Sequence, residues 1–286
     1  MAFIQIRGVD HYYEWITSAG AEPTGKPVMV FLHGWAGSGR YWESTAQALT
    51  ATFDCLLYDL RGFGRSRLPR NPDSALEFTY ELEGYAEELA ELLDAFHLHR
   101  VYLNAHSTGS SIAVFFLNLF PQKVERAILT CSGIFDYDER AFSTFHQFGK
   151  YVVQFRPSWF LRVPLLDKLF MARFLYRPLP TAISRAFLED FLMADYEAAL
   201  GTIYTAVSKQ AAEVMPLEFT QIQVPTLIVS GEYDQIIPAE MGRRAAALSP
   251  KVEFIMMRGT GHFPMLEDPE TYFKHLQDFL QLPVAS

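Results

Sequence analysis

The 286-residue chain has few of several features, and each shortage removes a class of protein. It has only two cysteines, Cys55 and Cys131, and both lie in apolar runs that predict buried strands, so we expect no disulfide. No apolar run approaches the roughly 18 residues that a membrane-spanning helix needs. Residues 1–7 lack the basic start and apolar core of a signal peptide. The sequence therefore predicts a globular protein of the cytoplasm.

Motifs for nucleotides and metals are also missing. The segment Gly62-Phe63-Gly64 has neither the third glycine nor the helix start that dinucleotide binding requires. The chain contains no Walker loop, no His-x-x-x-His and no metal-ligand spacing of Cys and His. We therefore expect no metal and no other cofactor.

Positive charge is the minority sign. With 24 Lys and Arg against 33 Asp and Glu, the net charge is −9, which argues against nucleic acid as a partner. The distribution is uneven, because residues 140–185 carry eight basic side chains against one acidic side chain and so have a net charge of +7. The same stretch is rich in aromatic residues: Phe142, Phe145, Phe148, Tyr151, Phe155, Trp159, Phe160, Phe170, Phe174 and Tyr176.

Short apolar runs alternate with helical patterns along most of the chain. Continuous apolar runs, typical of buried parallel strands, cover residues 28–32, 55–58, 101–103, 127–131, 224–229 and 252–256. Apolar residues recur every three or four positions over 82–96, and Pro238 and Pro269 mark two later helix starts. Residues 1–20 predict a hairpin that turns at 8–10. The expected fold is α/β, with a mostly parallel central sheet and helices on both faces.

One interval breaks this alternation. Residues 134–221 are helical in tendency, contain no clear strand, and lie between two expected strands of the sheet. We interpret them as a helical cap inserted over the carboxyl ends of the strands, where ligands bind in such sheets. The expected domains are a core of residues 1–133 and 222–286 and a cap of residues 134–221.

The chain is organised around Ser107. An apolar run ending at Leu103 meets Ala105-His106-Ser107-Thr108-Gly109, and a long apolar stretch follows. This pattern predicts a strand that turns sharply into a helix with Ser107 at the apex, where small neighbours let the two backbones approach. The free N–H groups at the start of the helix favour negative charge above Ser107. An exposed hydroxyl beside an anion site is the geometry that acyl transfer requires.

The turn resembles the nucleophile elbow of α/β-hydrolases, usually written G-x-S-x-G, with Ala105 in place of the first glycine. The resemblance covers nearly the whole chain through four ordered motifs. These are His33-Gly34-Trp35, the Ser107 elbow, a loop at 231–238 and a loop at 259–264. It implies a catalytic order of Ser, then acid, then His.

Asp234 is the expected acid. Gly231-Glu232-Tyr233-Asp234 follows a late strand and leads to Pro238, which is similar to the acid loop of the family. Asp136, just after the strand at 127–131, is the competitor, because some members of the family place the acid there. Glu232 lies at the turn rather than at the motif position.

His262 is the expected base. It follows the last strand in Gly259-Thr260-Gly261-His262, whose glycines let the loop fold back over Ser107. The other histidines fit less well by position, and His106 points elsewhere on the turn. The resemblance also implies an oxyanion hole made by the backbone N–H groups of Trp35 and Thr108.

Substrate contacts are expected at and beside the same loops. The candidates are His33, Gly34, His146, Trp159 and Phe263. His33 has an alternative role as a structural hydrogen-bonding group. His146 and Trp159 belong to the cap, whose aromatic residues either pack the cap on the core or admit a bulky apolar ester and touch an anionic membrane surface.

The main functional prediction is a serine hydrolase that cleaves a carboxylic ester through a Ser-His-Asp triad, with a bulky apolar or lipid-like ester as the candidate substrate. A C–C bond hydrolase of a diketone and a haloperoxidase-like enzyme are the alternatives with similar machinery. A receptor that keeps the hydrolase shell is the non-enzymatic alternative. An Asp-nucleophile epoxide hydrolase or dehalogenase is disfavoured, because the elbow residue is Ser107.

Overall fold

The computed structural model describes residues 2–69 and 79–282. Within them, eight strands form one sheet in the order β1-β2-β4-β3-β5-β6-β7-β8. From β4 to β8 all neighbours are parallel, whereas β1 and β2 pair antiparallel at one edge. The strands are β1 (Ala2–Ile6), β2 (Val9–Ile16), β3 (Val28–Leu32), β4 (Asp54–Tyr58), β5 (Val101–His106), β6 (Val124–Thr130), β7 (Thr226–Gly231) and β8 (Val252–Met257).

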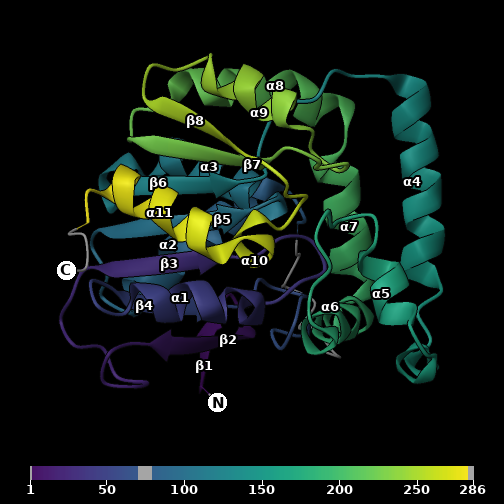
Figure 1. Ribbon diagram of the computed structural model, residues 1–286, viewed down its shortest axis with the longest axis horizontal. Coiled ribbons are helices and arrows are strands. Elements are labelled where there is room, and N and C mark those ends of the chain that lie inside the picture. The colour runs from purple at the N-terminus through teal and green to yellow at the C-terminus, as the bar shows by residue number, and fades with distance from the viewer. Residues whose placement is uncertain (1, 70–78, 283–286) are drawn as a thin grey trace.

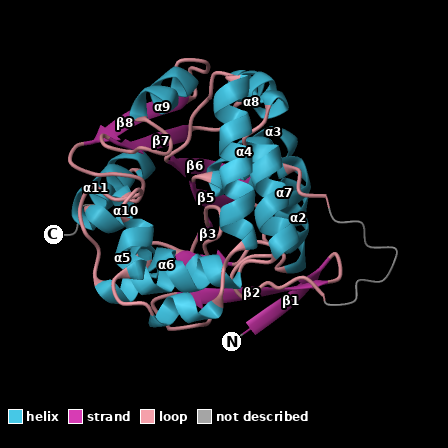
Figure 2. Cartoon of the chain, turned by 90° about the vertical axis from the view of Figure 1, so that its right-hand side faces the viewer, coloured by secondary structure: helices cyan, strands magenta, loops and turns pink. Residues whose placement is uncertain are grey.

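Helices cover both faces of this sheet, which confirms the predicted fold class (Figure 2). One layer holds α2 (Leu82–Ala95), α3 (Thr108–Leu119), α8 (Lys209–Gln221) and α9 (Ala239–Ala246). The other holds α1 (Glu43–Leu49) and α11 (Pro269–Leu280), with the short α10 (Pro264–Glu267) before it. The fully buried β3 serves both cores, because Val30 and Leu32 face the first layer while Met29 and Phe31 face the second.

The amino-terminal hairpin is confirmed, with its turn placed slightly earlier than predicted. β1 and β2 are joined at Arg7 and Gly8, which have φ angles of 48° and 77°. Positive φ at both central residues of a two-residue loop matches the twist of the flanking strands. The turn therefore lies at 7–8 rather than at 8–10.

The chain leaves the sheet after β6 and returns at β7. Between them lie α4 (Glu139–Gln154), the short 3-10 helix η3 (Ser158–Arg162), α5 (Leu166–Met171), α6 (Thr181–Met193) and α7 (Tyr196–Ala206). Two further 3-10 helices, η1 (Gly39–Trp42) and η2 (Pro121–Lys123), lie earlier in the chain. The helices α4 to α7 lie beyond the carboxyl ends of the strands, on the right of Figure 1. The helix α8 differs, because it packs against α3, and the amide of Asn118 donates to the carbonyl of Glu218 at 2.8 Å. The last helix of the 134–221 interval thus covers the sheet.

Two further features of the described residues bear on the expectations above. Cys55 and Cys131 are both free thiols and both buried. Among the helices of residues 2–69 and 79–282, none combines the length and the apolar character that crossing a membrane requires.

Candidate active site

Ser107 stands at the sharp turn between β5 and α3. Its φ of 54° and ψ of −122° are strained for a residue with a side chain. The turn depends on Gly109, because a Cβ there would lie 2.5 Å from the carbonyl oxygen of His33. Ala105, in the place of the family's first glycine, is fully buried in β5. Position 109 therefore has no room for a side chain, whereas position 105 accommodates a methyl group.

Three of the predicted residues form a continuous hydrogen-bonded chain. The Nδ1 of His262 lies 2.7 Å from Oδ2 of Asp234, and its Nε2 lies 3.1 Å from Oγ of Ser107. Since a carboxylate can only accept, Nδ1 carries the proton and Nε2 is left to accept from the serine hydroxyl. The three residues come from the ends of β5, β7 and β8, which the parallel sheet brings to one edge.

Asp234 is held as a carboxylate although it is buried. Its Oδ1 accepts the backbone N–H groups of Ile236 at 2.8 Å and Ile237 at 3.0 Å. Burial by itself would raise the pKa of Asp234, but the charge and hydrogen bond of His262 and these two N–H groups together lower that pKa below its usual value. Asp234 therefore stays ionised beside the imidazole.

The two competing carboxylates lie elsewhere. Asp136 is exposed and forms a two-point ion pair with Arg244, with both N–O distances at 2.7 Å. Glu232 accepts the backbone N–H of Gly259 at 2.9 Å and so holds the loop before His262. Neither carboxylate is hydrogen-bonded to the imidazole.

The backbone N–H groups of the two predicted oxyanion-hole residues are unused. Thr108 is the first residue of α3, so its N–H has no partner within the helix. Among the described residues, no acceptor lies within hydrogen-bonding geometry of the backbone N–H of either Thr108 or Trp35. The Trp35 side chain is tied back separately, because its indole N–H donates to the carbonyl of Ala199 at 2.9 Å. The two predicted oxyanion-hole residues thus each offer a free N–H.

A buried hydrogen-bond chain supports the loops around Ser107. The Nε2 of His106 lies 2.8 Å from the carbonyl oxygen of His262, so that nitrogen must donate. Its Nδ1 then accepts from the hydroxyl of Tyr41 at 3.0 Å, and the same hydroxyl accepts the backbone N–H of Gly34 at 2.5 Å. Burial lowers the pKa of His106 well below its usual value and keeps this ring neutral. The chain links the Gly34 loop to the His262 loop.

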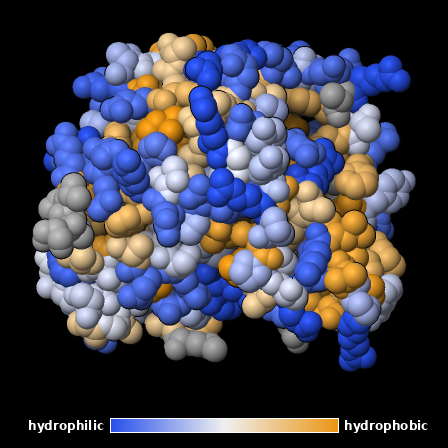
Figure 3. Space-filling view, viewed as in Figure 1, coloured by the Kyte–Doolittle hydropathy of each residue, from blue (hydrophilic) through white to orange (hydrophobic). Residues whose placement is uncertain are grey.

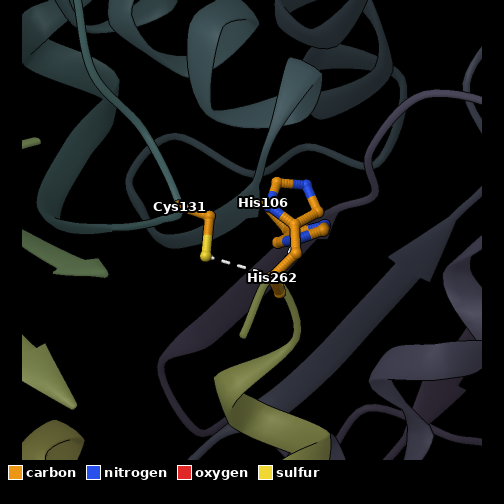
Figure 4. A group of neighbouring side chains, drawn as sticks. All are labelled: His106, Cys131 and His262. Atoms are coloured by element: carbon orange, nitrogen blue, oxygen red, sulfur yellow. Dashed lines mark hydrogen bonds between the residues drawn. The ribbon is translucent and has the colours of Figure 1, made fainter. Parts of the chain in front are cut away.

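His106, Cys131 and His262 also form the one His/Cys cluster of metal-site size among the described residues, with ligand atoms within 4.8 Å of one another (Figure 4). The cluster does not fit a metal. Both ring nitrogens of each histidine are engaged, and the Cys131 thiol donates to the carbonyl of His262 at 3.3 Å. Burial also raises the pKa of Cys131 well above its usual value, which opposes the thiolate that a metal needs.

The two histidines proposed as substrate contacts are each hydrogen-bonded to backbone atoms of the protein. His33 is fully buried, its Nε2 accepts the N–H of Leu60 at 2.8 Å, and its Nδ1 lies 2.8 Å from the carbonyl of Gly34. His146 hydrogen-bonds to the carbonyl of Val207 and so ties α4 to the end of α7. Both imidazole rings form hydrogen bonds with backbone groups, which is the alternative role considered for His33.

The remaining predicted contacts occupy three different environments. Gly34 lies against the nucleophile, since a Cβ there would be 3.1 Å from Cβ of Ser107. Phe263 is 7% exposed and packs beneath the site on His106 and Phe187. Trp159, in η3, is 52% exposed and stacks edge-on with its neighbour Phe160. Of the three, only Gly34 adjoins Ser107 directly.

Glu267 is a supporting residue for which the sequence carries no signal. Its Oε1 accepts the N–H groups of Gly261 and Phe263, and its Oε2 accepts those of Tyr176 and Arg177. One buried carboxylate thus joins the loop of His262 to the inserted segment. The backbone N–H of His262 adds a further tie, because it donates to the carbonyl of Phe174 at 2.7 Å.

An apolar pocket of about 420 Å³ lies in the inserted segment, between α4, η3, α5 and α6. Its wall is mostly apolar and includes Tyr151, Phe155, Phe160, Leu169, Phe170 and Phe191. The inner wall adjoins the site through aromatic contacts. The ring of Phe191 is 6.0 Å from that of Trp35, and Phe170 reaches Phe174, whose ring is 6.1 Å from that of His262.

Comparison with known proteins shows the family to which the chain belongs. A family model of the alpha/beta hydrolase fold matches residues 27–269, and the chain therefore belongs to that family, which confirms the resemblance noted in the sequence. The chain is 25% identical to a proline iminopeptidase of Heyndrickxia coagulans, over 90% of this chain and 91% of that protein.

Solved structures share the fold. An esterase from Exiguobacterium antarcticum superposes with a TM-score of 0.79 at 22% identity, covering 98% of this chain and 99% of that one. An enol-lactonase from Burkholderia xenovorans LB400 superposes with a TM-score of 0.76 at 20% identity, covering 98% and 100%. These likenesses concern the fold alone, and the named activities differ from one protein to the next.

Proposed function

We propose that the protein is a serine hydrolase that cleaves a carboxylic ester with a bulky apolar group. The observation that carries the proposal is the hydrogen-bonded chain from Ser107 Oγ through the imidazole of His262 to Asp234. A serine hydroxyl is a weak nucleophile until a neutral imidazole takes its proton. This chain supplies the base and the carboxylate that orients it.

In the proposed reaction, Ser107 Oγ attacks the ester carbonyl while His262 Nε2 takes the hydroxyl proton. Asp234 stabilises the imidazolium that forms. The imidazolium then gives its proton to the departing alcohol, which leaves an acyl group on Ser107. Water, deprotonated by His262, attacks the acyl-enzyme and releases the acid.

Stabilisation of the tetrahedral oxyanion is assigned to the backbone N–H groups of Trp35 and Thr108. Both donors are free of protein acceptors among the described residues. Thr108 follows Ser107 directly, and Trp35 follows Gly34, whose backbone lies against Ser107. Two preorganised donors in a site with little water are typically worth about 3–4 kcal/mol each to the transition state.

The apolar pocket supports the substrate class. A space of about 420 Å³ with an aromatic and aliphatic wall suits an alkyl or aryl group and offers nothing to a charged one. We therefore expect kcat/KM to rise with acyl length in a series of p-nitrophenyl esters. A flat series, or preference for the acetate, would argue for a small substrate.

Labelling with a fluorophosphonate tests the activity class. We expect covalent modification at Ser107, its loss in Ser107→Ala, and a decrease of about a thousandfold or more in the rate for Asp234→Asn, since the amide no longer holds the productive tautomer. Asp136→Asn is the matched control and should label at the wild-type rate, because its carboxylate faces Arg244. Absence of labelling in folded protein would favour an inactive receptor instead.

A further inference from the structure

The inserted segment exposes an unusual set of apolar side chains. Six large residues in α4, η3, α5 and the residues next to these helices are each more than half exposed: Phe148, Tyr151, Phe155, Trp159, Leu165 and Leu169. Among the other large apolar residues that the structure describes, only Tyr176 and Leu217 are more than half exposed, and the Tyr176 ring is stacked on Tyr233 at 4.1 Å. Figure 3 shows hydrophobic surface gathered over α5 and the adjoining end of α4. Such concentration on one face indicates a binding surface.

The residues of α4 are arranged for contact with a flat surface. Phe145, Phe148, Tyr151 and Phe155 follow one another at intervals of three, three and four residues. This spacing places them on one side of the helix, where all four are exposed. The opposite side of α4 packs on α7. The helix thus has one face packed within the protein and one face that presents four exposed aromatic side chains, of which Phe155 also contacts Phe160.

The inserted segment also carries unpaired positive charge. Five basic residues of the segment are exposed and form no ion pair among the described residues: Arg140, Lys150, Arg162, Lys168 and Arg173. The other three are used internally. Arg156 donates to the carbonyls of Phe191 and Ala194, while Arg177 and Arg185 pair with carboxylates. Of the unpaired charges, Lys150, Arg162 and Lys168 lie within three residues of one of the six exposed apolar side chains along the sequence.

We propose that this face, called the aromatic-basic face and made of the six apolar and five basic residues above, docks on the surface of an anionic lipid bilayer. Aromatic rings and aliphatic side chains suit the boundary between headgroups and acyl chains, and lysine and arginine are attracted to anionic headgroups. A second copy of the chain fits poorly, because two such faces in a symmetric dimer would bring five unpaired positive charges against five others.

The aromatic-basic face and the apolar pocket share three residues. Tyr151, Phe155 and Leu169 belong to the face and also line the 420 Å³ pocket, so the pocket opens where the bilayer would lie. An apolar molecule could pass from the membrane into the protein without crossing water. The docking itself does not depend on the proposed hydrolase activity.

Flotation of the full chain with lipid vesicles tests the proposal. We expect it to float with vesicles of phosphatidylcholine containing phosphatidylglycerol and to stay behind with phosphatidylcholine alone. Raising the salt from about 0.1 M to about 1 M shortens the Debye length from about 10 Å to about 3 Å and should release most of the protein.

Two double variants separate the contributions of charge and apolar contact. Lys150→Glu with Lys168→Glu should lower the partition coefficient about tenfold or more. Phe148→Gln with Leu165→Asn should lower it by a similar factor. Leu165 has a φ of 63°, a left-handed conformation that Asn adopts readily. The change to Asn therefore replaces an apolar side chain with a polar one without adding backbone strain. None of the four residues lines the pocket.

Exposed residues on other faces serve as matched controls. Leu217→Gln on α8 and Lys274→Glu on α11 change the same kinds of side chain and should leave flotation unchanged, with thermal unfolding confirming that every variant folds. No flotation, or equal flotation with neutral vesicles, would overturn the proposal. So would a dimer in light scattering that the Phe148→Gln, Leu165→Asn variant converts to monomer, since the face would then be a subunit interface.

Discussion

At the scale of single residues, the hydroxyl of Tyr41 holds two loops that the proposed chemistry needs. It accepts the backbone N–H of Gly34 and donates to the Nδ1 of His106, whose other nitrogen donates to the carbonyl of His262. Tyr41 is buried, and burial raises the pKa of its hydroxyl well above the usual value, so the group stays protonated and able to donate. The Gly34 loop carries one proposed oxyanion donor, and the His262 loop carries the proposed base.

Tyr41→Phe is expected to lower both the unfolding free energy of the protein and its rate of ester hydrolysis. The change leaves the N–H of Gly34 and the Nδ1 of His106 buried without a partner, which costs about 1–3 kcal/mol of unfolding free energy. We expect kcat on a soluble ester to fall with little change in KM. The reason is that the Gly34 and His262 loops lose the hydrogen bonds that position them, while the apolar pocket is unchanged. Urea unfolding and steady-state kinetics measure the two effects.

Tyr58→Phe is the matched control, because Tyr58 is equally buried and its hydroxyl has no hydrogen-bond partner in the described chain. Its removal should leave kcat unchanged and stability unchanged or slightly higher. Equal effects of the two substitutions would show that Tyr41 acts only by filling space.

At the scale of elements, α6 is attached to the core by a buried carboxylate. Asp190 is 3% exposed, and its oxygens contact Ser38 Oγ at 2.8 Å and the guanidinium of Arg40 at 2.8 Å. Burial raises the pKa of Asp190 to about 6, and the attraction of Arg40 and the hydrogen bonds only partly oppose it. The attachment of this helix therefore titrates in a mildly acidic range.

The raised pKa of Asp190 determines how the unfolding free energy changes with pH. The folded-state pKa lies above the ordinary value of 3.8, so the folded protein holds this proton more tightly than the unfolded chain. The contribution is fully present below about 3.8 and is lost as the pH rises through about 6. We expect the unfolding free energy of the wild type relative to Asp190→Asn to fall by up to about 3 kcal/mol between these limits. Urea unfolding across this range measures it, and a difference that grows with pH would contradict the assignment.

At the scale of the whole molecule, the charge and the apolar surface are segregated. Among its described residues, a chain of net charge −9 carries five exposed basic residues without an ion pair in the same inserted segment as its most exposed apolar side chains, while Lys251, Arg258 and Lys274 stand singly on the core. If the face docks and the pocket takes the ester, anionic vesicles should raise the rate on a long-chain ester several-fold and leave a short soluble ester unaffected.

The Lys150→Glu, Lys168→Glu variant should lose this stimulation while keeping the wild-type rate on the short ester. Neutral vesicles should have no effect on either protein. Stimulation by neutral vesicles as strong as by anionic ones would indicate that the vesicles merely disperse the substrate.

The sequence by itself determined the fold class and the three proposed catalytic residues. The reason is local: continuous apolar runs mark buried strands, and the elbow, acid and histidine motifs each follow the end of such a run. In a parallel sheet those ends meet at one edge, so Ser107, Asp234 and His262 are brought together by topology alone.

Only the tertiary structure decided which groups support the site and which surface stays exposed. Glu267 holds backbone up to 91 residues away, and Tyr41 reaches His106 across 65 residues, which no local pattern records. The roles of His33 and His146 depend in the same way on which backbone atoms their rings meet. An aromatic side chain looks alike in sequence whether it packs inward, as Phe174 does on His262, or faces outward, as Phe148 does. Its direction is set by long-range packing of the inserted helices.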